Sequence, residues 1–265
     1  MKYINNNKQE KLKINKQNTY LVIDFDKTIT SNQSQDSWAA SANADILGKE
    51  ITQKMDELCQ KYEPIELNHT IPVEEKEKHM EKWYGGCMDL YYQYKLTQEK
   101  LEQSIKQSNL IFRQGAKDIL EKCYKENIPV IILSAGIGNV IEQFLKANNC
   151  YTDNMYIISN FIEFKSDGSM KKFDHYKMIH TLNKTMSGHL PKEIQQKIQD
   201  KEYAILMGDM VEDEKMIEES KWEKTIKIGF LNKKLEENLP MYLKHFDIVL
   251  TKEDATFEII DNIVF

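Results

Sequence analysis

Two acidic residues stand directly after an apolar run near the start of the chain. The run Tyr20–Ile23 is followed by Asp24 and Asp26, which are separated by a single residue. A continuous apolar run that ends in polar residues is typical of a central parallel strand, and ligands of open α/β sheets bind beyond the carboxyl ends of such strands. Neighbouring carboxylates repel each other unless a cation or a shared proton offsets their charge. Mg²⁺, which proteins often hold with one or two carboxylates plus a substrate phosphate, is the simplest such cation.

Polar residues also follow apolar runs later in the chain. Ser134 follows one such run, Asp209 and Asp213 follow another, and Lys184 lies in the segment between them. Each position has an ordinary alternative, because serine and aspartate often cap helices or form turns and a lysine is usually solvated. Found together in this order, the four positions are far more specific than any one of them alone.

This set resembles the haloacid dehalogenase-like phosphohydrolases. Asp24–Thr28 matches the D-x-D-x-T motif of that family, and the hydroxyl, lysine and acidic motifs that follow are matched at the positions just described. One branch, the cytosolic pyrimidine 5′-nucleotidases with a helical cap, is similar to this chain from about Tyr20 to the C-terminus. The stretches that carry this similarity are Tyr62–Glu66, Val73–Lys76, Met80–Tyr84, Ile132–Gly138, Ser159–Phe164, Ile179–His180 with Asn183–Lys184, Lys227–Asn232 and Asp247–Leu250.

The resemblance implies an α/β fold: a doubly wound, parallel, Rossmann-like core sheet with an inserted all-helical cap domain. The order of elements agrees, because strands and helices alternate from Gly115 onward, as in a parallel sheet covered on both faces. We expect residues 19–32 and 110–265 to form the core and residues 33–109 to form a cap that serves as a lid over the crevice. We expect residues 1–18 to form a polar tail that is either flexible or helical.

Several elements can be expected in more detail. Apolar residues at helical spacing predict cap helices over about 44–62, 73–94 and 97–105. Pro64 predicts an extended piece after the first of them, and Gly85 and Gly86 predict a break or a close approach in the second. In the core, we expect a strand to end at Ser134 and a helix to run from the Asp209 loop to Lys221.

The chemistry of phosphate esters and the resemblance together suggest roles for the acids. Asp24 would attack phosphorus and form an aspartyl-phosphate, while Asp26 would protonate the leaving 5′-oxygen and later deprotonate water. Mg²⁺ would be held by Asp24, by Asp209 and by Asp26 through its backbone carbonyl. Asp213 would belong to the same metal site and would orient Lys184 or a metal-bound water.

Other residues would hold the substrate. Lys184 and the Ser134 hydroxyl, with the backbone around Ala135 and Gly136, would bind the phosphate oxygens.

By resemblance, Glu66 accepts a hydrogen bond from the base, and Trp83 and Tyr84 can stack on it. The alternatives are a solvated acid at a cap turn and aromatic packing within a helical bundle. Cys87 lies where the branch has a serine near the substrate, and Met210 and Glu212 replace a serine and a glycine of the acidic motif.

Composition excludes several classes of function. The net charge is −6 and Arg113 is the only arginine, which weakens a nucleic-acid-binding interpretation, because that function calls for a clustered basic patch. No apolar run reaches the ~18 residues of a transmembrane helix, and the N-terminal residues lack the apolar core of a signal peptide. The four cysteines are widely spaced, which favours reduced thiols in the cytoplasm. We therefore expect a cytoplasmic monomer that binds no nucleic acid or membrane.

The leading hypothesis is a Mg²⁺-dependent 5′-nucleotidase for pyrimidine nucleoside monophosphates such as CMP and UMP. The branch also includes enzymes that use 7-methylguanosine monophosphate and enzymes that transfer phosphate to another nucleoside. Two alternatives stay open: a phosphatase for another small ester such as phosphoserine, and a nucleotide-binding module that has lost catalysis.

Overall fold

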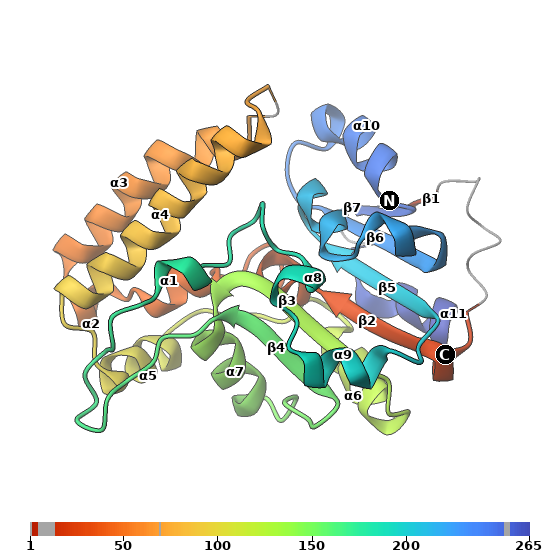
Figure 1. Ribbon diagram of the computed structural model, residues 1–265, viewed down its shortest axis with the longest axis horizontal. Coiled ribbons are helices and arrows are strands. Elements are labelled where there is room, and N and C mark those ends of the chain that lie inside the picture. Colours follow the sequence, from red (N-terminus) through yellow and green to blue (C-terminus); the bar gives the residue numbers. More distant parts are fainter. Residues whose placement is uncertain (1, 5–13, 69, 252–254) are drawn as a thin grey trace.

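A twisted seven-stranded sheet forms the centre of the protein (Figure 1). The computed structural model describes residues 2–4, 14–68, 70–251 and 255–265. The strand order is β1-β7-β6-β5-β2-β3-β4, and all pairs are parallel except β1 with β7. The six parallel strands therefore follow the order 3-2-1-4-5-6 of doubly wound folds, which confirms the predicted α/β core. The strands are β1 (Lys2–Ile4), β2 (Thr19–Ile23), β3 (Val130–Ile137), β4 (Met155–Asn160), β5 (Tyr203–Gly208), β6 (Thr225–Leu231) and β7 (Ile248–Thr251).

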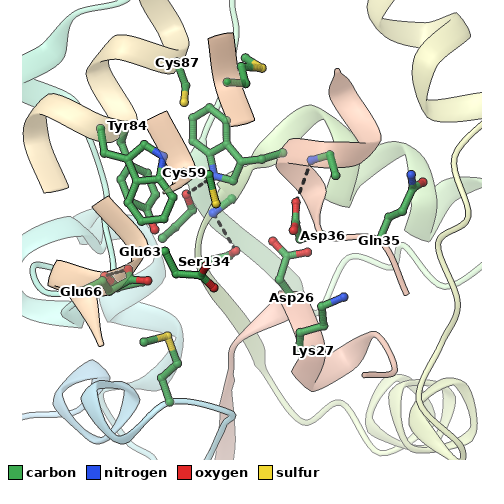
Figure 2. A pocket seen from close by; sticks show the side chains of 18 of the residues that line it. Asp26, Lys27, Gln35, Asp36, Cys59, Glu63, Glu66, Tyr84, Cys87 and Ser134 are labelled. Carbon is green, nitrogen blue, oxygen red and sulfur yellow. Dashed lines mark hydrogen bonds between the residues drawn. The ribbon is translucent and has the colours of Figure 1, made fainter. Parts of the chain in front are cut away.

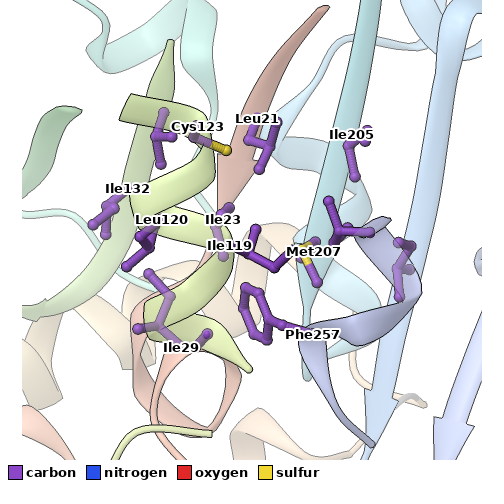
Figure 3. Packing of buried hydrophobic residues seen from close by; sticks show 14 of the residues in the cluster. Leu21, Ile23, Ile29, Ile119, Leu120, Cys123, Ile132, Ile205, Met207 and Phe257 are labelled. Carbon is purple, nitrogen blue, oxygen red and sulfur yellow. The ribbon is translucent and has the colours of Figure 1, made fainter. Parts of the chain in front are cut away.

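Helices cover both faces of this sheet because alternate strand residues point to opposite sides. Leu21 and Ile23 of β2 belong to one apolar cluster, which Figure 3 shows against Ile119 and Leu120 of α6. Val22, between them, belongs to the cluster on the other face. The first face carries α6 (Ala116–Lys125), α7 (Gly138–Ala147) and the turns η8 (Phe257–Ile260) and α11 (Asp261–Val264); the second carries α8 (Met186–His189), α9 (Lys192–Ile198) and α10 (Leu235–His245).

Between β2 and α6, the described residues form five α-helices. They are α1 (Ser37–Ser41), α2 (Ala44–Leu47), α3 (Lys49–Glu66), α4 (Val73–Gln93) and α5 (Gln98–Lys106). Helices α3 and α4 form a long antiparallel hairpin beside the sheet (Figure 1). Their apolar side chains share one cluster with Ala135 and Ile137 of β3, so this helical layer packs directly on the end of the core. The boundaries at 33 and 109 stay a prediction.

A hairpin of the core reaches out to the helical layer. The hairpin is formed by residues 164–170, and the Lys165 amide closes its turn by donating to the Ser169 carbonyl at 2.8 Å. The amide of Gln98, at the start of α5, donates to the Gly168 carbonyl at 3.0 Å, and the amide of Met170 donates to the Leu96 carbonyl at 3.2 Å. The base of the helical layer is thereby tied to the core by backbone hydrogen bonds.

Several local expectations were wrong. Helix α3 continues through Pro64 to Glu66, because a proline near the end of a helix costs only one backbone hydrogen bond before the helix would stop anyway. Strand β3 runs past Ser134 to Ile137, with an irregular register against β4. Two 3₁₀ turns, η5 (Val211–Met216) and η6 (Glu219–Lys224), replace the single helix expected after Asp209.

Two further expectations have mixed outcomes. Helix α4 is unbroken, so its glycines mark a close approach: a Cβ on Gly85 would lie 3.1 Å from the His175 ring, and one on Gly86 3.2 Å from Leu58. Residues 2–4 of the predicted tail form edge strand β1, while residue 1 and residues 5–13 lie outside the described residues. Within the described part of the chain, no helix combines the length and apolar character needed to cross a membrane.

Candidate active site

The turn after β2 places Asp24 at the carboxyl end of a central strand of the sheet. The Asp24 amide donates to the Met207 carbonyl of β5 at 3.0 Å, and the Thr30 amide closes a wide turn onto the Phe25 carbonyl at 3.0 Å. Lys27 adopts a left-handed conformation (φ 61°) within this turn, at a cost of roughly 1 kcal/mol for a side chain with a Cβ. Because β2 and β5 are the strands between which the chain order reverses, Asp24 lies at the switch point where such folds bind ligands.

A buried lysine bridges two carboxylates at this point. Lys184 Nζ lies 2.6 Å from Asp24 Oδ1 and 2.6 Å from Asp213 Oδ1, and all three side chains are buried. Burial would lower the pKa of Lys184, but Asp213 and Asp24 together raise it above its usual value. Burial raises the pKa of Asp24 to about 6 although Lys184 opposes this shift. Lys184 is therefore a fixed cation inside the site, and the surface-lysine interpretation is wrong.

The loop after β5 is organised by Asp213. Its Oδ2 accepts hydrogen bonds from the amides of Asp209 and Met210, both at 3.0 Å. A Cβ on Gly208 would lie 2.3 Å from the same oxygen, so only glycine leaves room for this contact. Both oxygens of Asp213 thus have protein partners, which suits a residue that orients Lys184 and the loop.

The acids at the switch point could hold a divalent cation. Asp24, Asp209 and Asp213 each offer an oxygen, and these oxygens lie within 4.8 Å of one another. Burial, followed by the charges of Asp24 and Asp213, raises the pKa of Asp209 well above its usual value. Asn232 supports Asp209 by donating to Oδ2 at 3.2 Å. Hard oxygen donors with excess negative charge fit Mg²⁺, and these residues therefore fit the predicted metal.

Asp26 lies outside this acidic cluster and contacts the helical layer instead. Its carboxylate accepts the Ser37 amide at 2.8 Å and the Ser37 hydroxyl at 2.5 Å. Burial, followed by the charge of Asp36, raises the pKa of Asp26 to about 8. The Asp26 carboxylate is not part of the acidic cluster, and the role of its backbone carbonyl as a metal ligand stays a prediction. A carboxyl group that keeps its proton near neutral pH suits a general acid.

Gly136 makes this arrangement sterically feasible. A Cβ on Gly136 would lie 2.0 Å from Ser37 Oγ and 2.7 Å from Asp26 Oδ2. We expect Gly136→Ala to displace both groups and to destabilise the fold by about 1–3 kcal/mol, as overpacked sites do. Turnover should fall by at least about ten-fold, because it depends on a well-placed acid. Urea unfolding and steady-state rates would measure both, and a variant with unchanged rate and stability would contradict the close approach.

One cavity of about 530 Å³ joins all the predicted residues. Figure 2 shows Asp26 and Lys27 on one side, Glu66 and Tyr84 on the other, and Ser134 between them. Its lining includes every predicted site residue: Asp24, Asp26, Glu66, Trp83, Tyr84, Cys87, Ser134, Ala135, Gly136, Lys184, Asp209 and Asp213. Ser134 does not cap a helix; its Oγ accepts the Gly136 amide at 3.0 Å.

The far end of the cavity is aromatic and contains a buried acid. Glu66 is only 7% exposed, so the interpretation as a solvated acid is wrong. Burial raises the pKa of Glu66 to about 7. Trp83 and Tyr84 line the cavity and also pack on each other, with ring centroids 5.5 Å apart. Aromatic packing in the helical layer and a place in the cavity wall therefore do not exclude each other. Cys87 is buried beside them.

Three contributors were missed by the sequence analysis. Ser37 holds Asp26, Trp38 donates its indole N–H to the Ala135 carbonyl at 3.2 Å, and Thr181 donates its hydroxyl to Glu66. The first two lie just after Asp36, whose side chain caps α1, and an aspartate before a short apolar run is a usable signal for a helix start. No local pattern marks Thr181.

Comparison with protein families identifies the chain. Residues 22–265 match the family of pyrimidine 5′-nucleotidases (UMPH-1). The chain belongs to this family. It is therefore a 5′-nucleotidase, a hydrolase of nucleoside monophosphates built on a haloacid dehalogenase-like core.

Named relatives of this 5′-nucleotidase support the assignment. The 7-methylguanosine phosphate-specific 5′-nucleotidase of Homo sapiens is 32% identical over 250 residues, which cover 92% of this chain and 83% of the relative. The protein of the same name from Drosophila melanogaster is 30% identical over 247 residues, covering 90% and 76%.

Solved structures show the same architecture. A crystal structure of cytosolic 5′-nucleotidase IIIB bound to cytidine superposes with a TM-score of 0.80 at 27% identity, covering 94% of this chain and 85% of that one. Phosphoserine phosphatase in its apo form gives a TM-score of 0.57 at 18% identity, covering 93% and 98%, and shares the fold.

Proposed function

We propose that this 5′-nucleotidase is Mg²⁺-dependent and hydrolyses pyrimidine nucleoside monophosphates such as CMP and UMP through an aspartyl-phosphate on Asp24. The observation that carries the proposal is the cavity itself. The Asp24–Lys184 pair lies in it at the carboxyl end of the central strands. The buried Glu66 lines its other end, together with Trp83 and Tyr84. Such a cavity can bind a phosphate and a base at the same time.

The first half of the reaction uses two acids. An oxygen of Asp24 forms a bond to phosphorus while the bond between phosphorus and the 5′-oxygen breaks. Asp26 gives its proton to that leaving oxygen, so the nucleoside departs neutral. In the second half, Asp26 takes a proton from water, which attacks phosphorus and frees Asp24 and inorganic phosphate.

The phosphate oxygens need donors while charge shifts between them. Lys184 supplies a fixed positive charge that is already desolvated and oriented by Asp213. The Ser134 oxygen accepts the Gly136 amide, so its O–H can donate to a phosphate oxygen. Donors that are oriented before the reaction stabilise its transition state without further reorganisation.

Asp24 and Asp209, with the backbone carbonyl of Asp26, would hold Mg²⁺. When bound, the cation offsets the charge of the carboxylates and the phosphate and acts as a Lewis acid. Asn232 keeps Asp209 oriented for this role through the hydrogen bond described above.

The base would be selected by Glu66. A carboxylate accepts hydrogen bonds from ring N–H and amino groups, and a buried acceptor rejects bases that lack such donors. Aromatic rings beside it offer stacking surfaces for bases of any identity. Relatives are named for 7-methylguanosine phosphate and a solved relative holds cytidine, so 7-methyl-GMP belongs in any substrate test.

The pH dependence of substrate affinity tests the role of Glu66. Its pKa is about 7, set first by burial and then by Thr181, Glu212, Glu63 and Lys76. Because Glu66 becomes an ionised acceptor above this pH, we expect the KM for CMP to fall several-fold between pH 6 and pH 8. In Glu66→Gln this dependence should disappear, and KM should be raised at pH 8. An unchanged profile in the variant would remove Glu66 from base recognition.

A panel of monophosphates tests the proposed function. CMP, UMP, 7-methyl-GMP, AMP, phosphoserine and ribose 5-phosphate are compared by phosphate release, with Mg²⁺ and with EDTA. We expect the pyrimidine nucleotides to have the highest kcat/KM and EDTA to abolish turnover. Turnover of phosphoserine alone would favour the other phosphatase, and binding without turnover would favour a lapsed binding module.

We also propose that the protein acts as a cytoplasmic monomer. A solved relative is named as cytosolic, which supports the location. Size-exclusion chromatography with light scattering would test the oligomeric state.

A further inference from the structure

A hydrogen bond between Thr181 and Glu66 connects the base-reading end of the cavity to the core. Thr181 Oγ1 donates to Glu66 Oε1 at 2.7 Å, and the two residues come from opposite sides of the interface between core and helical layer. Both side chains line the cavity. Glu66 is the last residue of α3, while Thr181 lies in the core segment between β4 and α8.

Thr181 is held rigidly by its own segment. The amide of His180 donates to Asn183 Oδ1 at 2.8 Å, and the Asn183 side chain donates to the Met178 carbonyl at 2.9 Å. Asn160 of β4 fixes the start of the segment through two hydrogen bonds with the backbone of Ile179. The same segment ends in Lys184, so one rigid turn carries both the hydroxyl at Glu66 and the ammonium group at Asp24.

Glu66 needs such an anchor. The carboxylate stands at the C-terminal end of α3, where the helix dipole disfavours a negative charge. Glutamate has three side-chain torsions, and fixing them costs on the order of 1.5–2 kcal/mol of rotamer freedom. Lys76 is the cation that acts on it, but that ammonium group also lies 3.8 Å from Glu212. The Thr181 hydroxyl is thus the direct hydrogen-bond donor that orients the carboxylate.

We propose that Thr181 is a positioning residue for base recognition, which orients Glu66 so that Oε2 faces the nucleobase. This inference rests on the proposed role of Glu66. Thr181 belongs to the core and Glu66 to the helical layer. The hydrogen-bonded pair that recognises the base therefore forms only when the two parts are in contact. Base recognition and the phosphate site are thereby coupled through residues 181–184.

Removing one hydroxyl tests this inference. Thr181→Val keeps the shape of the side chain, and we expect the KM for CMP to rise about ten-fold with little change in kcat. The KM for ribose 5-phosphate, which has no base, should stay the same. Thr181→Ser should restore the wild-type KM. The same chemical change in Thr152→Val, whose hydroxyl bonds Asn154 in a loop of the core, serves as the control.

A pH profile separates positioning from a structural role. The Thr181 hydrogen bond lowers the pKa of Glu66. In Thr181→Val, the pH at which CMP affinity improves should therefore move upward, whereas general loosening of the fold would leave that midpoint in place. Direct titration of CMP into the Asp24→Asn forms of both proteins gives Kd values without turnover.

Four outcomes would contradict all or part of this inference. An equal rise in KM for CMP and ribose 5-phosphate, or an unmoved pH midpoint, would overturn the role of Thr181. If Glu66→Gln changes CMP affinity but Thr181→Val does not, Glu66 reads the base without help and only this inference fails. If neither variant changes the preference for CMP over ribose 5-phosphate, the proposed base recognition fails as well.

Discussion

Asp24→Asn is expected to reduce phosphate release from CMP and UMP by about 10⁴-fold or more, as removal of a nucleophile does in other hydrolases. An amide oxygen cannot form the phosphoryl bond, while the shape of the side chain is retained. The buried Lys184 would still contact Asp213, so the site should stay folded. Phosphate release under single-turnover conditions measures the effect.

Controls make this result specific. Thermal unfolding of Asp24→Asn should resemble that of the wild type. Asp45→Asn makes the same chemical change at an exposed position of α2 and should leave the rate unchanged. Turnover of Asp24→Asn within ten-fold of the wild type would show that another group attacks phosphorus.

Lys184→Met is expected to damage both activity and stability. It leaves Asp24 and Asp213 buried without their shared cation, and breaking a buried ion pair in this way typically costs about 3–5 kcal/mol. Without the oriented ammonium group, kcat should fall by about 10²–10³-fold. Urea unfolding at pH 7 and steady-state kinetics measure the two effects separately.

The matched control is Lys177→Met. That side chain is 78% exposed and lies 3.9 Å from Asp174, so its removal should change neither quantity. Full activity of Lys184→Met would mean that the phosphate is held by other donors. Unchanged stability would mean that one of the two carboxylates takes up a proton when the lysine is absent.

The sheet and the phosphate end of the site follow from the sequence because their signals are local. Tyr20–Ile23 is a continuous apolar run, and the polar residue that follows such a run must lie at the carboxyl end of that strand. Asp24 and Asp209 obey this rule, so the topology alone brings them together, whereas Ser134 lies within β3. The order of the strands then places Asp24 and Asp209 directly after the ends of two adjacent strands, β2 and β5.

The contacts between core and helical layer could not be predicted in this way. Ser37 approaches Asp26 only because Gly136 leaves space for its hydroxyl, and Thr181 reaches Glu66 across 115 residues of sequence. Such pairs depend on how α1 and α3 dock, which no local spacing encodes. Pro64 did not end α3 as expected. The helix continues for two residues beyond it, to Glu66, which lines the cavity.

Trapping the covalent intermediate tests the central claim most directly. Enzyme mixed with excess CMP and Mg²⁺ is quenched in acid within milliseconds and treated with borohydride, which reduces an aspartyl-phosphate to homoserine. Peptide mass spectrometry should then find homoserine at position 24, and only when CMP and Mg²⁺ are both present. Unmodified Asp24 in a sample that is turning over, or modification at another carboxylate, would contradict the account.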